Sequence, residues 1–153
     1  MRHLKEGMKA PVFEGIDQNG NSVSLDNFAG KKIILYFYPK DNTTACTVEA
    51  CNLRDNWDSF LKKGFIVIGV SPDEEKSHKR FADKYSLPFP LIVDTSKKII
   101  NDYGVWGEKM MYGRTFLGVI RTTFIIDEKG IIEKIITKVE TSRHSNQILS
   151  MYE

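Results

Sequence analysis

The sequence predicts an α/β fold in which helices flank a central mixed β-sheet. Runs of β-branched and aromatic residues alternate along the chain with longer stretches of helical periodicity, as they do in α/β proteins. The last two apolar runs are separated only by the turn Asp-Glu-Lys-Gly at 127–130, which indicates an antiparallel hairpin and therefore a mixed sheet. The 153 residues contain no repeat and no long Pro/Gly-rich linker, so we expect a single domain covering residues 1–153.

Three elements are expected in the N-terminal part of the chain. Asn19-Gly20 lies between two short alternating segments, and this dipeptide is the strongest local signal for a tight hairpin turn, so we expect an N-terminal β-hairpin extension. Residues 31–39 form a continuous β-branched and aromatic run, which predicts a strand buried on both faces of the sheet. A helical pattern follows this strand and continues to Lys62.

The same alternation continues to the C-terminus. Apolar β-branched runs predict strands at 65–72, 90–94, 122–127 and 131–138. Between and after them, helical patterns predict helices at 73–85 and 97–103 and a last short helix at the end of the chain.

The composition excludes several classes of function. Lys and Arg number 22 and Asp and Glu 20, so the net charge of +2 provides no strongly basic surface of the kind that nucleic-acid binding requires. No apolar run approaches the roughly 18 residues of a membrane span, and the N-terminus has no apolar signal region. We therefore expect a cytoplasmic protein with no nucleic-acid or membrane partner. In the cytoplasm a cysteine pair that matters is more often catalytic or metal-bound than structural.

Two cysteines, Cys46 and Cys51, stand at the start of the predicted long helix. Cys46 begins an apolar stripe whose other members are Ala50, Leu53, Trp57 and Phe60. A small buried core residue is therefore one interpretation of Cys46. Cys51 lies on the polar face of the same helix, where packing gives no reason for a thiol. The spacing C-x4-C with three scattered histidines does not supply a metal site, and it does not match the C-x-x-C redox motif.

The position of Cys46 suggests chemistry. Pro39 and the polar run that follows it break the preceding strand and place Cys46 in the first turn of the helix. Free backbone N–H groups and the positive end of the helix dipole favour a thiolate there, and a thiolate is a nucleophile. Thr43 is either the N-cap of the helix or a hydroxyl that contacts a substrate oxygen beside the sulfur, and the sequence leaves both open.

Pro39, Thr43 and Cys46 spell P-x-x-x-T-x-x-C, which resembles the active-site signature of the peroxiredoxins, thiol peroxidases that reduce hydroperoxides. The second cysteine five residues later is similar to the peroxiredoxin Q or bacterioferritin comigratory protein subgroup. The resemblance extends over nearly the whole chain, through segments such as FADKYSLPFPLIVD, YGVWGEK and IRTTFIIDEKGII. It implies a thioredoxin-like fold with an N-terminal extension.

The resemblance also implies a role for each matching residue. Cys46 is the implied peroxidatic cysteine and Cys51 the resolving cysteine. The implied supporting residues are Thr43 as hydroxyl partner, Pro39 as pocket wall, Arg121 as cation and Glu49 in a supporting position. Two of them have plainer interpretations, since Pro39 can simply end a strand and Arg121 can be a surface charge at a strand end.

The implied activity is the reduction of hydrogen peroxide and organic hydroperoxides for antioxidant defence. Cys46 becomes a sulfenic acid, Cys51 converts it to an intramolecular disulfide, and a thioredoxin or similar dithiol restores both thiols. The resemblance implies no metal or other cofactor. We expect a monomer, because the chain lacks a C-terminal resolving arm.

Two other classes of function compete with this interpretation. One is a redox-sensing or disulfide-exchanging binding protein on the same scaffold. A thioredoxin-type reductase would carry a proline before the strand at 122–127, whereas this chain has Arg121-Thr122-Thr123. The other is a non-catalytic α/β interaction module with incidental cysteines.

Helix geometry makes a further prediction. Two residues five positions apart on an α-helix are separated by a rise of about 7.5 Å and a rotation of roughly 140°, so their Cα atoms lie about 8–9 Å apart. A disulfide needs Cα atoms within about 7 Å. If Cys46 and Cys51 pair, we expect the helix to unwind from Thr44 to about Leu53.

Overall fold

The sheet is built around strand β3 (Lys32–Phe37), which is buried on both faces as predicted. β3 pairs in parallel with β4 (Phe65–Ser71) on one side and antiparallel with β8 (Thr122–Ile126) on the other. The sheet has seven strands in the order β2-β1-β5-β4-β3-β8-β9, so it is mixed, as the sequence predicts. The computed structural model describes residues 3–153, and the first two residues of the predicted domain lie outside the described residues.

Short strands form both edges of the sheet. β1 (Glu14–Ile16) and β2 (Ser22–Ser24) make the predicted N-terminal hairpin, which β1 joins to β5 (Leu91–Val93). Gly20 in its turn has a φ of +77°, a left-handed conformation that favours glycine. At the other edge β9 (Ile132–Ile136) pairs antiparallel with β8 and confirms the predicted C-terminal hairpin.

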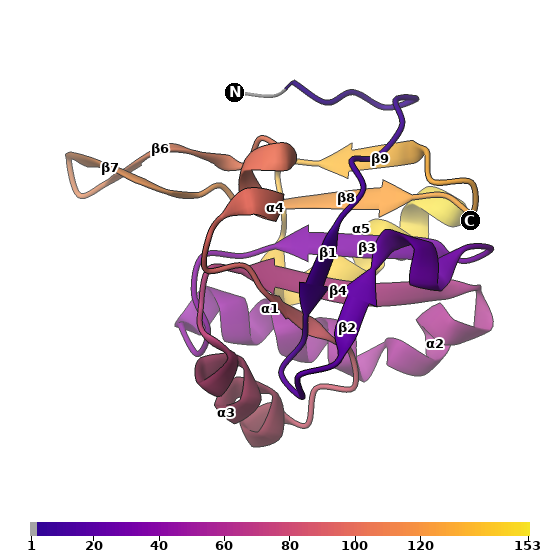
Figure 1. Ribbon diagram of the computed structural model, residues 1–153, viewed down its shortest axis with the longest axis horizontal. Coiled ribbons are helices and arrows are strands. Elements are labelled where there is room, and N and C mark those ends of the chain that lie inside the picture. Colours follow the sequence, from indigo (N-terminus) through magenta and orange to yellow (C-terminus); the bar gives the residue numbers. More distant parts are fainter. Residues whose placement is uncertain (1–2) are drawn as a thin grey trace.

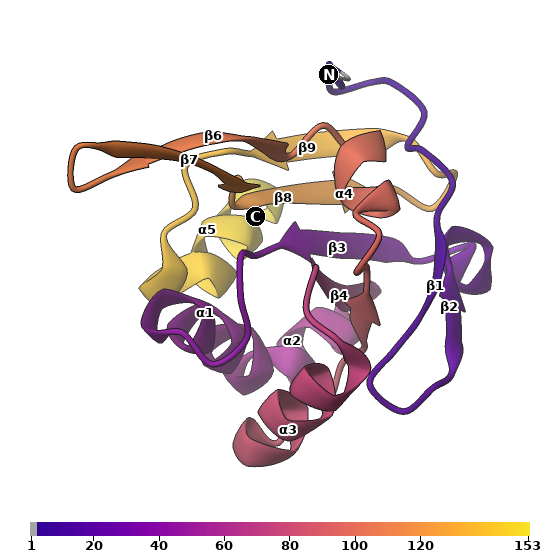
Figure 2. The same ribbon diagram turned by 60° about the vertical axis from the view of Figure 1, so that its left-hand side comes forward.

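Helices cover both faces of the sheet, because the side chains of β3 point alternately to two hydrophobic cores. The core on one face lies under α4 (Lys98–Asp102). The core on the other face is covered by α1 (Thr44–Asp55), α2 (Trp57–Lys62), α3 (Glu75–Tyr85) and α5 (His144–Leu149) (Figures 1 and 2). The described residues also form three 3-10 turns: η1 (Leu25–Phe28), η2 (Thr141–Arg143) and η3 (Ser150–Tyr152). Within residues 3–153, no helix combines the length and the apolar character needed to cross a membrane.

The long helix predicted up to Lys62 is interrupted at Asn56. α1 ends at Asp55, α2 begins at Trp57, and Asn56 between them has φ −110° and ψ 13°. The Asn56 side chain donates its Nδ2 to the carbonyl oxygen of Asn52 at 2.9 Å. An Asn side chain that bonds the nearby backbone competes with the hydrogen bonds of the helix. The prediction of one continuous helix is therefore wrong at this residue.

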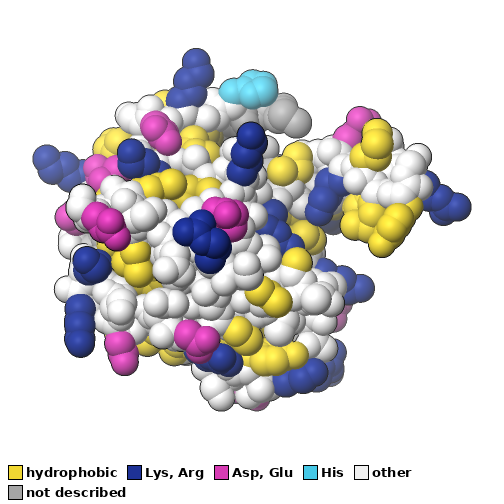
Figure 3. Space-filling view, turned by 180° about the vertical axis from the view of Figure 1, so that it is seen from behind, with side chains coloured by type: hydrophobic (Ala, Val, Ile, Leu, Met, Phe, Trp, Pro, Cys, Tyr) yellow, Lys and Arg dark blue, Asp and Glu magenta, His cyan; other side chains and the backbone are white. Residues whose placement is uncertain are grey.

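The sequence pattern also misses a hairpin formed by β6 (Trp106–Met111) and β7 (Arg114–Val119). It forms a two-stranded sheet of its own and stands away from the body of the molecule (Figures 1 and 3). The turn of the hairpin and the adjoining parts of both strands expose five large apolar side chains: Met110, Met111, Tyr112, Phe116 and Leu117. Because much of the hairpin is exposed on both faces, its apolar residues do not mark one buried side, and no period-2 pattern indicates the strands.

Candidate active site

Cys46 lies in the first turn of α1, as the sequence predicts. After β3 the chain passes through a loop in which Asn42 has a φ of +60°, and it enters α1 at Thr43. Thr43 has the φ of −86° and ψ of 159° of an N-cap residue, and its carbonyl oxygen accepts the hydrogen bond of Thr47 N–H at 2.9 Å. The Cys46 side chain is only 1% exposed and faces the core between α1 and the sheet.

Arg121 contacts Cys46 from 75 residues along the chain. Thr122, the residue after Arg121, pairs with Phe37 at the end of β3. This pairing places Arg121 beside the point where the loop to α1 begins. Its Nη2 donates to Cys46 Sγ at 3.3 Å, and its Nη1 donates to Glu49 Oε1 at 2.6 Å. Burial works against the charge of Arg121, but Glu49 and Cys46 outweigh it and raise its pKa. One guanidinium therefore joins the thiol to a carboxylate, and the interpretation of Arg121 as a simple surface charge does not hold.

Glu49 is completely buried one helical turn after Cys46. Its Oε2 accepts no hydrogen bond from any described residue, and the Nε2 of His144 lies 3.7 Å away. Burial raises the pKa of Glu49 to about 7, although Arg121 opposes this shift. Burial likewise lowers the pKa of His144 to about 4. At neutral pH His144 is uncharged, while at Glu49 burial and the charge of Arg121 act in opposite directions.

Replacing Glu49 by Gln is expected to change how stability depends on pH. The pKa of Glu49 is 4.5 ordinarily and about 7 in the folded protein, so between these values the folded protein holds a proton that the unfolded chain has lost. The contribution of Glu49 to the free energy of unfolding therefore falls as the pH rises through this range. Gln does not titrate, so the stability of Glu49→Gln relative to wild type should rise by about 2–3 kcal/mol over the same range.

Urea unfolding of the two proteins at about pH 4.5, 6 and 7.5 measures this change. The stability contributed by His144 is fully present above pH 6.5 and is lost as the pH falls toward 4. It is common to both proteins and cancels in the difference. A difference that stays constant with pH would mean that Arg121 keeps Glu49 ionised throughout.

Thr43 and Pro39 belong to the loop that leads into α1. The Thr43 side chain does not cap the helix: its Oγ1 donates to the carbonyl oxygen of Lys40 at 2.8 Å, and the residue is exposed. Pro39 is half-buried and follows the last residue of β3 by two positions. Among the hydrogen bonds within residues 3–153, none joins Thr43 to Cys46.

Cys51 lies on the same helix as Cys46 but apart from it. Both cysteines are free thiols, and Cys51 is half-buried rather than fully buried. α1 is continuous from Thr44 to Asp55, so helical spacing keeps the two Cα atoms about 8–9 Å apart. The structure thus brings Cys46, Arg121 and Glu49 into contact and leaves Cys51 outside this group.

A network of hydrogen bonds that the sequence does not reveal fixes the loop before α1. The Asp41 carboxylate accepts hydrogen bonds from the hydroxyls of Tyr38 at 2.6 Å and Ser77 at 2.8 Å, and it lies 2.7 Å from His78 Nδ1. Asp41, Asp73 and His78 hold metal-ligand atoms within 4.8 Å of one another, but these atoms are engaged in hydrogen bonds to protein groups. Apart from Tyr38, the partners of Asp41 lie 32 or more positions away in the sequence, so only the fold brings them to this loop.

Lys109 of β6 is a second cation whose charge acts on the site. Burial and the charge of Arg121 lower the pKa of Lys109, while Cys46 acts in the opposite direction. Its Nζ lies 5.9 Å from the ring centroid of Phe116, its partner across the hairpin. Lys109 ends the segment Val-Trp-Gly-Glu-Lys, but nothing in its spacing to the cysteines singles it out.

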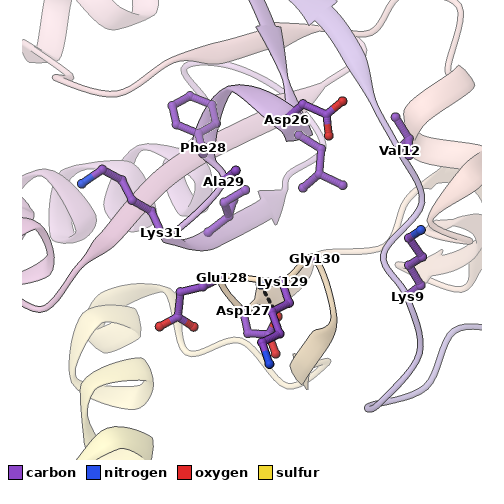
Figure 4. Close-up of a pocket in the computed structure, with 12 residues that line it drawn as sticks. Lys9, Val12, Asp26, Phe28, Ala29, Lys31, Asp127, Glu128, Lys129 and Gly130 are labelled. Carbon is purple, nitrogen blue, oxygen red and sulfur yellow. Dashed lines mark hydrogen bonds between the residues drawn. The ribbon is translucent and has the colours of Figure 1, made fainter.

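A hollow in the surface lies away from these residues. It is lined by side chains of η1 and of the turn between β8 and β9, among them Asp26, Phe28 and Lys129 (Figure 4). Ile33 at the start of β3 pairs with Ile126 at the end of β8, so this turn lies at the opposite end of β3 from the loop that leads into α1. The hollow is therefore not part of the candidate site.

Comparison with known proteins shows the family of the chain. The model of the AhpC/TSA family matches residues 7–135, which include every candidate site residue. The chain belongs to the AhpC/TSA family. Among curated relatives, the putative peroxiredoxin bcp of Coxiella burnetii is 43% identical over 95% of this chain and 97% of its own. Peroxiredoxin Bcp of Escherichia coli is 43% identical over 98% of this chain and 96% of its own.

Solved structures of the same family share the fold. A PrxQ variant from Xylella fastidiosa has a TM-score of 0.92 at 27% identity and covers 99% of this chain and 97% of its own. A peroxiredoxin Q variant from Xanthomonas campestris has a TM-score of 0.85 at 33% identity, with coverages of 92% and 89%. These matches confirm the predicted thioredoxin-like α/β fold. The AhpC/TSA protein described here is a peroxiredoxin, a thiol-dependent peroxidase, and its family implies a peroxide substrate and a thioredoxin-like reductant.

Proposed function

We propose that the protein reduces hydrogen peroxide and organic hydroperoxides with Cys46 as the peroxidatic cysteine and Cys51 as the resolving cysteine. The observation that supports this most is the contact of Arg121 Nη2 with Cys46 Sγ. A guanidinium keeps its charge at working pH, and Glu49 anchors this one, so a negative charge on the sulfur is stabilised. The N-terminus of α1 acts in the same direction on a sulfur in its first turn.

In the first step the Cys46 thiolate attacks one oxygen of the peroxide. An S–O bond forms as the O–O bond breaks, and the departing oxygen takes a proton and leaves as water or alcohol, so Cys46 becomes a sulfenic acid. The N–H groups of Arg121 stabilise the charge that develops on the departing oxygen. Thr43 donates its own hydrogen to Lys40, which leaves its oxygen lone pairs to accept the hydroperoxide hydrogen. The family resemblance gives Pro39 the role of a wall beside the reacting sulfur.

In the second step the Cys51 thiol attacks the sulfenic sulfur. The S–S bond forms, and the hydroxyl of the sulfenic acid leaves with the thiol proton as water. Because the intact helix holds the two Cα atoms too far apart for a disulfide, part of α1 unwinds in each cycle. Thr47 and Val48 lie in this part, and their β-branched side chains lower helix propensity slightly.

A thioredoxin or similar dithiol then reduces the disulfide by thiol–disulfide exchange and restores both cysteines. This cycle uses no metal or organic cofactor. All of its residues belong to one chain, so we propose that the protein acts as a monomer, in the cytoplasm, as part of antioxidant defence.

One equivalent of hydrogen peroxide added to the reduced protein is expected to remove two thiols per chain rapidly. The first thiol is lost to oxidation by the peroxide and the second to the disulfide. Thiol titration on a quenched time course gives the number, and mass spectrometry without reductant locates the disulfide. Cys51→Ser is the control: it should lose one thiol at the same rate and accumulate a sulfenic acid on Cys46.

Three results would contradict the proposal. Loss of thiols at the rate of a small free thiol would favour a disulfide-exchanging or non-catalytic protein. A disulfide between two chains would remove the resolving role of Cys51 within its own chain. Wild-type protein that loses one thiol per chain and stops at a sulfenic acid on Cys46, with Cys51 still a free thiol, would remove that role altogether.

A further inference from the structure

The helical turn that carries Cys51 is fastened to the C-terminal part of the chain through the next residue, Asn52. The Oδ1 of Asn52 accepts from the backbone N–H of Ser145 at 2.7 Å, and its Nδ2 donates to the carbonyl oxygen of Ser142 at 3.2 Å. Its backbone oxygen accepts from the hydroxyl of Ser145 at 3.0 Å. η2 and α5 therefore lie against α1 beside Cys51 (Figure 2).

The loop at the other end of the cysteine segment is also fastened, through Asp41. The Asp41 carboxylate takes hydrogen bonds from Tyr38 and Ser77 and contacts His78, and its backbone N–H donates to Asp73 Oδ2 at 2.8 Å. The residues between these two anchors include both cysteines. Cys51 adjoins the Asn52 anchor, while Cys46 lies in the middle of the segment.

Both anchors can stay in place while the disulfide forms. Along an intact helix the Cα atoms of Thr43 and Cys51 lie about 12 Å apart, at a rise of 1.5 Å per residue. Cys46 is three residues from Thr43, and three extended residues span about 10 Å. An unwound Cys46 can therefore bring its Cα within the roughly 7 Å of Cys51 that a disulfide needs. Unwinding of residues 44–50 is sufficient, which is a shorter stretch than helix geometry alone suggests.

Cys46 is the cysteine that oxidation releases. Among residues 3–153, its Sγ accepts one hydrogen bond, from Arg121, and a neutral sulfenic acid attracts a guanidinium less strongly than a thiolate does. The bonds of Asn52 contain no group that the peroxide changes. After the first step, the interaction of Arg121 with Cys46 is weaker, while the hydrogen bonds of Asn52 beside Cys51 are unchanged.

We propose that Asn52 is a positioning residue for the second step: it keeps Cys51 stationary on the folded end of α1 while residues 44–50 unwind and carry Cys46 to it. This inference rests on the proposed function, because it requires Cys51 to be the resolving cysteine. Asn52 takes no part in the first step, since among residues 3–153 its side chain bonds Ser142 and Ser145, whereas Arg121 bonds Glu49 and Cys46.

The test measures the two steps separately in wild type and in Asn52→Ala. Each reduced protein is mixed with one equivalent of hydrogen peroxide, quenched with an alkylating reagent at successive times and analysed by mass spectrometry for sulfenic acid and disulfide. We expect the sulfenic acid to form at the wild-type rate and the disulfide to form about fivefold more slowly, because two partly exposed hydrogen bonds are lost. Excess peroxide should then convert more of Cys46 to sulfinic acid in this variant.

Two further variants distinguish positioning from general weakening of the helix. Asn52→Asp keeps the acceptor for the Ser145 N–H and should recover most of the rate of disulfide formation. Asn101→Ala is the control: it removes the side-chain amide of another helical Asn, an exposed one that bonds the carbonyl oxygen of Lys97, and it should change neither step.

Amide hydrogen exchange on the wild-type protein gives an independent measurement. In the disulfide form the N–H of Ser145 should stay as protected as in the reduced form, while the amides of residues 47–50 exchange faster. Loss of Ser145 protection on oxidation, or disulfide formation in Asn52→Ala at the wild-type rate or faster, would overturn the role of Asn52. Wild type that forms no intramolecular disulfide would instead overturn the proposed function itself.

Discussion

Replacing Cys46 by Ser is expected to lower the rate of hydroperoxide reduction by more than about 10⁴-fold, as loss of a catalytic nucleophile does in other enzymes. The reacting species is a thiolate, and a serine hydroxyl is scarcely ionised near neutral pH even beside a guanidinium. The contact of Arg121 with the side chain at position 46 therefore stabilises a charge that Ser does not carry. The fold should survive, because the change removes little volume from the core.

The measurement is the second-order rate constant with hydrogen peroxide, obtained under single-turnover conditions in which no external dithiol is needed. Cys51→Ser is the matched control, since it removes the other thiol of the chain and should keep the first step intact. Circular dichroism of both variants checks that α1 is still formed. Peroxidase activity retained in Cys46→Ser, at any substantial fraction of wild type, would end the assignment of Cys46 as the nucleophile.

The parts of the fold that the sequence predicts are those in which neighbouring residues share one environment. β3 is buried on both faces, so its apolar run is continuous, and the Asn19-Gly20 turn requires only local conformations. The hairpin formed by β6 and β7 has no buried face along much of its length, so it leaves no periodic signal. The break at Asn56 depends on one side chain that bonds a backbone oxygen, which periodicity does not register.

The candidate site likewise contains residues that local sequence predicts and residues that only the fold brings into place. Cys46 can be predicted as a candidate nucleophile because the loop before it and the helix that it enters are its neighbours in sequence. Arg121 cannot be found from spacing, because only the pairing of β3 with β8 brings it to Cys46, and its role entered through the family resemblance. Asp41 has one near partner, Tyr38, but its other partners and those of the Asn52 side chain lie 32 or more positions away, so the sequence alone does not show what these two polar residues do.

The two interpretations of Cys46 in the sequence turn out to be compatible. The side chain belongs to the core on one face of the sheet, as its apolar stripe suggests, and it also contacts a guanidinium. Burial alone would destabilise a thiolate, so the charge of Arg121 and the N-terminus of α1 must offset it. In the proposed mechanism the reactivity of the buried sulfur therefore depends on this cation.

Replacing Arg121 by Lys is accordingly expected to lower the second-order rate constant about 10²–10³-fold, the usual effect of removing a donor that stabilises transition-state charge. Arg121 uses Nη1 for Glu49 and Nη2 for Cys46 at the same time. An ammonium group keeps the charge but cannot reproduce this planar, two-pronged geometry. Arg143→Lys is the matched control, because the Arg143–Glu140 pair is more than half exposed and should leave the rate unchanged. A wild-type rate constant in Arg121→Lys would contradict the assigned role.

A double-mutant cycle with Glu49→Gln then tests how Glu49 acts. If Glu49 only orients the guanidinium, Glu49→Gln should slow peroxide reduction in the wild-type background and have little further effect once Arg121 is Lys, so the two losses should not add. If Glu49 acts on the peroxide by another route, the losses should add. The contact of Glu49 Oε1 with Arg121 Nη1, together with the complete burial of Glu49, leads us to expect the first result.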